Sequence, residues 1–254
     1  MKKTRSFFHS PMGTLFLFML AALLLMTGTI GGVRAAPQIL NPDFAYSGLE
    51  LDQIGVTLRE NGNSISSRNY NSSTQAFDVT TGALFQQLLG EKEEFKIGKV
   101  YDEALSVYNS GSIPEFVRVT VYKYWVDDKG NRFDAYNVAK EDILNKLIEL
   151  NFLETNGWKI DHNADTKERT VLYYQNVLNP GAATPACTDK LKINEDVIDL
   201  VKVTGNTVTW VADGLTFQIE AEANAVQNHN ARAAVKSAWG LTDNDITRLG
   251  LKLG

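Results

Sequence analysis

Few residues of this 254-residue chain have the type and spacing that catalysis or metal binding requires. Two of its three histidines, His162 and His229, stand far apart in the sequence, and no His-Glu-x-x-His motif is present. A zinc site takes three or four His, Cys or carboxylate ligands, which are usually grouped at short spacings. The sequence therefore predicts neither a metal site nor a catalytic histidine.

A second candidate is the run Asp161-x-Asn163-x-Asp165, which has the spacing of the first ligands of a calcium loop. Such a loop requires a glycine at its sixth position and a bidentate glutamate at its twelfth. Thr166 and Leu172 occupy those two places. A hairpin turn is the better interpretation of this segment.

The single cysteine, Cys187, excludes an intramolecular disulfide. A nucleophilic thiol needs a base beside it, and no histidine is close to Cys187 in the sequence. No Gly-x-Ser-x-Gly motif is present either. These absences favour a protein that is not an enzyme and that uses no cofactor.

The first 35 residues have the pattern of a secretory signal peptide. Lys2, Lys3 and Arg5 precede twelve uninterrupted apolar residues, 15–26, and Val33 and Ala35 suit the −3 and −1 positions of a cleavage site. A permanent membrane anchor is the alternative, but twelve apolar residues fall short of the roughly 20 that a span needs. We expect signal peptidase to act on the chain and the mature protein to be secreted.

The mature chain is acidic. Residues 1–35 carry four Lys or Arg and no Asp or Glu, so their removal changes the net charge from −5 to −5 − 4 = −9. Phosphates would repel such a chain, and nucleic acid is therefore not an expected partner.

Two segments alternate apolar and polar residues in the way that half-buried β-strands do. They are residues 116–126 and 215–225. Their apolar positions are the predicted structural core: Val117, Val119, Val121, Trp125, Leu215, Phe217 and Ile219.

The rest of the mature chain indicates a mainly β protein. Residues 36–60 are predicted to form an extended arm and a first strand, whose apolar side chains are Ile54, Val56 and Leu58. The polar residues 61–74 are predicted to be a surface loop, and helices are expected at about 82–89, 139–150 and 231–238. The expected fold for residues 61–254 is a single domain, a jelly-roll-like two-sheet antiparallel sandwich with two or three inserted helices.

Three stretches together resemble the TasA/camelysin family of exported Gram-positive proteins. They are Asn109-Ser110-Gly111 followed by FVRVTVYKYW, then YYQNVLNPG at 173–181, and LTFQIEAEANAVQNHNARAAVKSAWG at 215–240. The resemblance covers roughly residues 95–125 and 158–240. Members of the family form biofilm-matrix and cell-surface fibres.

The resemblance implies a structural subunit that polymerises with copies of itself outside the cell, in the matrix or at the cell surface. Other matrix or anchoring proteins are further possible partners. In the family, the N-terminal segment of one subunit adds a strand to the next, which here would assign polymerisation to Ile54, Val56 and Leu58. Two alternatives stay open: a camelysin-like surface metallopeptidase and a monomeric adhesin.

Overall fold

The computed structural model describes residues 53–85, 88, 95–132, 144–199, 201–204, 207–210 and 212–253. The chain divides into two units, Met1–Leu49 and Glu50–Gly254, and every described residue belongs to the second. The predicted signal peptide and the predicted arm up to residue 52 lie outside the described residues. Within the described part of the chain, no helix is both long and apolar enough to cross a membrane.

One layer of the fold is built around an antiparallel sheet in the order β3-β2-β1-β5. The segment after Ala182 continues this layer past β5, because the N–H groups of Thr184 and Cys187 bond to the carbonyls of Val107 and Leu105. A second sheet follows in the order β4-β10-β7. The strands are β1 (Gly55–Glu60), β2 (Asn63–Asn71), β3 (Ala76–Thr80), β4 (Tyr101–Asp102), β5 (Leu105–Asn109), β7 (Ile148–Phe152) and β10 (Thr188–Ile193).

The other layer is an antiparallel sheet in the order β13-β6-β9-β8. Its two long strands, β6 (Glu115–Val126) and β13 (Thr216–Gln227), pair over their full length of 12 residues each. The shorter strands β9 (Arg169–Tyr174) and β8 (Trp158–Ile160) follow beside β6. A separate hairpin is formed by β11 (Val201–Thr204) and β12 (Thr207–Trp210).

The hydrophobic core lies between the two layers. Val56 and Leu58 of β1 and Val107 of β5 belong to the same buried cluster as the alternating valines of β6. Fully burying one such side chain stabilises a fold by about 1.5–3 kcal/mol. Of the predicted core residues, Val117, Val119, Val121, Trp125 and Ile219 are buried in this cluster, and Leu215 and Phe217 pack against it half-buried.

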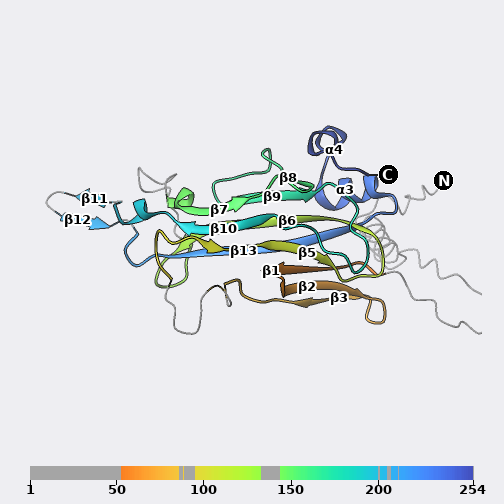
Figure 1. The fold of residues 1–254 in the computed structure, drawn as a ribbon, viewed down its shortest axis with the longest axis horizontal. Helices are drawn as coiled ribbons and strands as arrows, with labels where there is room; N and C mark the ends of the chain where they lie inside the picture. Colours follow the sequence, from red (N-terminus) through yellow and green to blue (C-terminus); the bar gives the residue numbers. More distant parts are fainter. Residues whose placement is uncertain are drawn as a thin grey trace, which may run out of the picture. The chain divides into compact units, whose positions relative to one another are not determined.

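Two short helices cover the outer face of the β6 sheet (Figure 1). They are α3 (Ala231–Trp239) and α4 (Asp243–Leu249), and their buried residues pack on Phe116 of β6 and Tyr173 of β9. Thr242 and Asp245 form a capping box at the start of α4, because each side chain bonds to the backbone N–H of the other residue. The prediction of a mainly β, antiparallel sandwich with few helices is confirmed.

Three local predictions are corrected. Residues 63–71 form β2 rather than a loop, because the Asn61-Gly62 turn, with φ of 48° and 87°, directs them back along β1 as a hairpin. Leu84 and Phe85 form a turn where a helix was expected, and most of 86–94 lies outside the described residues.

The third correction concerns the helix expected at 139–150. Residues 133–143 lie outside the described part, and the chain after Leu144 forms a single 3₁₀ turn, η3 (Asn145–Leu147), that leads directly into β7. Another 3₁₀ turn, η4 (Glu195–Asp199), comes after β10. Leu144, Leu147 and Ile148 are buried. Their apolar pattern predicted burial correctly. Leu144 is helical as predicted, but Leu147 lies in the 3₁₀ turn and Ile148 begins β7, where pairing with β10 extends the chain.

Candidate functional site: a groove beside an open strand edge

The first strand, predicted to be the polymerising element, is an inner strand of its own sheet. β1 pairs with β2 on one side and with β5 on the other, both within the same chain. Val56 is 4% exposed and Leu58 is 1% exposed, and Ile54 immediately precedes the strand. In this structure, therefore, the three predicted polymerisation residues belong to the subunit's own fold.

The Asn109-Ser110-Gly111 turn holds the beginning of β1. The buried Asn109 side chain donates to the carbonyls of Ile113 and Leu178 and accepts from the N–H of Gly111. The N–H of Gln53 donates to Oγ of Ser112, whose own N–H donates back to the Gln53 carbonyl. These bonds fix the position of Gln53, the first described residue, against the turn.

β13 is an edge strand. It pairs with β6 along one side, and no described strand pairs with its other side. Its side chains alternate: Ala221, Ala223 and Ala225 pack on the core, while Glu222 faces solvent. A strand that exposes its N–H and C=O groups in this way is a ready template for a further strand.

A groove runs between this open edge and the apolar face of β1. It consists of two adjoining hollows of about 370 and 280 Å³, which share Val56, Arg68 and Glu222 among their lining residues. Ile54, Val56 and Leu58 line one side, where Ile54 is half-buried and Val56 and Leu58 are almost fully buried, and Ala221–Ala225 of β13 form the opposite wall. The predicted polymerisation residues thus meet the alanines of β13 at one site, whereas the predicted core residues Leu215, Phe217 and Ile219 line neither hollow.

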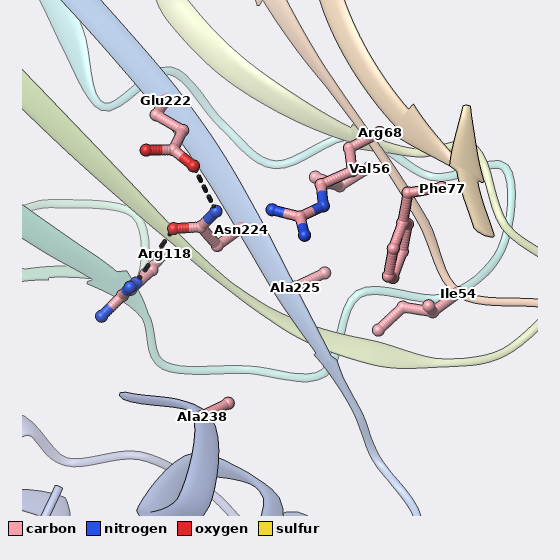
Figure 2. Close-up of a pocket in the computed structure, with 9 residues that line it drawn as sticks. All are labelled: Ile54, Val56, Arg68, Phe77, Arg118, Glu222, Asn224, Ala225 and Ala238. Carbon is pink, nitrogen blue, oxygen red and sulfur yellow. Dashed lines mark hydrogen bonds between the residues drawn. The ribbon is translucent and has the colours of Figure 1, made fainter. Parts of the chain in front are cut away.

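Polar side chains border the groove (Figure 2). Nε of Arg118 donates to Oδ1 of Asn224 over 3.2 Å, and Nδ2 of Asn224 donates to Oε1 of Glu222 over 2.8 Å. On the other side of β13, the guanidinium of Arg68 reaches from β2 toward that strand. Its Cζ lies 4.6 Å from the ring centroid of Phe77. The groove therefore has a mixed lining, in which apolar side chains of β1 and β13 lie beside hydroxyl groups of β2 and β3, with two arginines and one carboxylate.

The β2–β3 hairpin forms the outer wall. Phe77 and Val79 of β3 are 41% and 60% exposed, and Tyr70 meets Phe77 edge to face with ring centroids 5.4 Å apart. All five residues of β3 are exposed. This wall is built on few apolar contacts, which gives it the freedom to adjust around an occupant.

Buried carboxyl groups lie at both ends of β1. At its end, Glu60 accepts a hydrogen bond from the N–H of Phe85, and burial together with the nearby Glu60 carboxylate raises the pKa of Glu103 to about 9. At its beginning, burial raises the pKa of Glu115 to about 8, against the opposing effect of the Gly55 N–H. Glu103 and Glu115 are each 1% exposed or less, and with a raised pKa each carboxyl group is mainly protonated at neutral pH.

The residues considered for metal binding or catalysis are dispersed. His162 bonds to Asp165 over 3.1 Å and is well exposed, His229 lies exposed in the turn before α3, and Asp161 accepts from Arg248 and from the N–H of Asn163. No group of three His, Cys, Asp or Glu side chains that could hold a metal ion occurs among the described residues.

Sequence reasoning missed Arg68, which stood in the segment predicted as a loop, and the groove as a whole. The alternation in β13 was visible in the sequence, but an open edge follows only from the order of strands in the sheet. No family model matches the chain, and neither a curated protein nor a solved structure is significantly similar to it.

Proposed function

We propose that the mature chain is a secreted structural subunit that assembles into extracellular fibres by adding an N-terminal strand to a neighbouring copy. The observation that carries this proposal is the groove: a 12-residue strand with an open edge lies beside apolar side chains of β1 and β3. A strand entering there gains backbone hydrogen bonds from β13 and places alternate side chains against Ile54 and the exposed Phe77 and Val79. The resemblance to fibre-forming exported proteins is consistent with this role.

The donor we propose is the arm that precedes β1, residues 36–52, and not β1 itself. β1 is held on both sides by its own chain, and its exchange would require the two-residue Asn61-Gly62 turn to open. The side chain of Asn61 anchors this turn by bonding to the carbonyl of Asp102 and the N–H of Ala104. Ile54 then lines the groove that receives the neighbour's arm, beside the buried Val56 and Leu58.

The arm has the length and composition that this role needs. An extended chain rises about 3.3 Å per residue, so 17 residues reach roughly 55 Å. Five residues of β13 form the groove wall, which corresponds to only about 17 Å. The arm also contains Phe44, Tyr46, Leu49 and Leu51, apolar side chains that an aqueous environment does not favour on a free tail.

Electron microscopy of two chains tests the proposal. The mature chain, residues 36–254, is expected to form filaments, and a chain of residues 53–254, which retains every described residue, is expected to stay monomeric. A synthetic peptide of residues 36–52 should then bind the shortened chain without producing filaments, because that complex has no free arm. Filaments from residues 53–254 alone would contradict the proposal.

The metallopeptidase and adhesin hypotheses predict other results. EDTA-sensitive hydrolysis of casein, abolished by His162→Ala or His229→Ala, would support a peptidase. A mature chain that binds cells and stays monomeric at high concentration would support an adhesin. The described residues offer no specific geometry in favour of either.

A further inference from the structure

We propose that Arg68 and Arg118 make the groove selective for an acidic strand, so that carboxylates of the neighbour's arm set which strand enters and in which register. This inference rests on the proposed function and adds to it the chemistry by which the occupant is recognised. Its occupant is one segment, residues 43–52 of a second copy.

The charge at the groove opposes the charge of the whole molecule. Two guanidinium groups and a single carboxylate, that of Glu222, line it, which gives the groove a net positive charge on a mature chain of net charge −9. A positive groove on an acidic subunit favours an acidic partner and repels a basic one.

Neither arginine is neutralised by a carboxylate within the described part of the chain. Arg68 is exposed, and its guanidinium lies over the ring of Phe77. Arg118 bonds to the neutral amide of Asn224 and lies 5.5 Å from the Trp239 ring centroid. By comparison, Arg132, Arg232 and Arg248 each pair with Asp or Glu.

Arg68 is also placed where an entering strand must pass. It stands directly opposite Val56 in the β1–β2 ladder, so the two side chains project from the same face of the sheet. Figure 2 shows its guanidinium extending from β2 toward β13, so a strand paired with the open edge of β13 would pass beside it. A cation at this point is partly desolvated when the groove fills, which increases the effect of any opposing charge.

The arm has the complementary charge. Residues 36–52 contain Asp43, Glu50 and Asp52 and no Lys or Arg. Leu49 and Leu51 alternate with Glu50 and Asp52, so a strand formed there presents leucines on one face and carboxylates on the other. The leucines suit the apolar side chains of Ile54, Phe77 and Val79, and the carboxylates suit the arginines at the border.

The pattern also explains how register is fixed. A shift by one residue would turn Glu50 and Asp52 onto the apolar side chains of the groove and expose both leucines. Burying unpaired carboxylates in this way is strongly unfavourable. The alternation and the charges thus specify the same register.

A charge exchange in the mature chain tests the inference. Arg68→Glu alone and the arm variant Glu50→Lys/Asp52→Lys alone are each expected to raise the protein concentration left soluble at equilibrium by roughly tenfold or more, as judged by sedimentation. The chain carrying all three substitutions, and an equal mixture of the two variants, should return to within about threefold of the wild-type value. Arg68→Lys should resemble wild type.

Lys129→Glu is the matched control, since it makes the same charge change in the exposed turn after β6. Thermal unfolding shows whether each variant is folded. The variant Glu50→Lys/Asp52→Lys changes residues outside the described fold, so its result does not depend on whether Arg68→Glu folds. Assembly of Arg68→Glu and of the arm variant at the level of Lys129→Glu would overturn the charge selectivity while leaving strand addition intact. A wild-type mature chain without filaments would overturn the proposed function itself.

Discussion

Gly55 and Gly111 lie backbone against backbone at the beginning of β1. The N–H of Gly111 donates to the carbonyl of Gly55 over 3.1 Å, and a Cβ added to Gly111 would stand 2.5 Å from the Gly55 nitrogen. A Cβ added to Gly55 would in turn meet the Gly111 nitrogen at 2.8 Å. Glycine is required at both positions, because the two main-chain segments approach so closely that neither leaves room for a Cβ.

Gly111→Ala is therefore expected to destabilise the fold by about 2–3 kcal/mol, since the added methyl group forces the β1 backbone away from its turn. Urea unfolding followed by tryptophan fluorescence measures this change. Gly62→Ala is the control: it meets no atom within 4 Å, but its φ of 87° disfavours alanine, so about 1 kcal/mol is expected. Equal effects of the two substitutions would show that the backbone around Gly111 accommodates the added methyl group without strain.

Stability is expected to fall as pH rises from about 5 to 9. Glu103 has its pKa raised from 4.5 to about 9, mainly by burial, so between these values the native state holds a proton that the unfolded state has released. The native state binds more protons over this range, and the free energy of unfolding therefore decreases with pH. Glu115, with its pKa raised to about 8, acts in the same direction. Urea unfolding at about pH 6, 7.5 and 9 measures the slope.

Glu103→Gln tests the assignment, because the amide is neutral at every pH and nearly the same size. We expect it to stabilise the fold by about 1–3 kcal/mol at about pH 8 and to reduce the pH slope. Glu195→Gln, at an exposed position of η4, changes charge without burial and should leave the slope unchanged. A Glu103→Gln variant with the wild-type slope would show that this carboxyl does not titrate between about pH 5 and 9.

Cys187 is expected to be inert in the folded protein. Its side chain is fully buried in the main core, and burial raises its pKa to about 12. A thiol reagent such as Ellman's reagent should react with the native chain at least about 100-fold more slowly than with the chain in urea, since the thiolate is the reactive form. Rapid reaction of the native chain would show that the segment before β10 opens readily.

Sequence patterns predicted those parts of the fold in which side-chain period and burial coincide. The alternation at Val117, Val119 and Val121 marked β6, and that at Phe217 and Ile219 marked β13, because in both strands one face is covered by the core. The helix predicted at 231–238 became α3 with nearly the same bounds. A segment with a strong local period keeps its predicted secondary structure when no tertiary contact favours another.

Other parts depended on contacts that the local sequence does not contain. β2 has a polar sequence in which no residue is fully buried, and its pairing with β1 uses main-chain groups that every residue possesses. The groove depends on β13 having a neighbour on one side only among the described strands, which is a property of strand order. Arg68 gains its position from the register that places it opposite Val56.

The role of β1 provides the last prediction. A chain beginning at residue 62 lacks β1 and is expected not to fold, because β2 and β5 each lose their shared partner and Val56 and Leu58 leave the core. A chain beginning at residue 53 keeps these contacts and should unfold cooperatively. Far-ultraviolet circular dichroism and urea titration of the two chains separate these outcomes. If the chain from residue 62 folds cooperatively and regains stability when a peptide of residues 53–61 is added, β1 is exchangeable between copies. In that case β1 would be the donor strand in place of the arm before it.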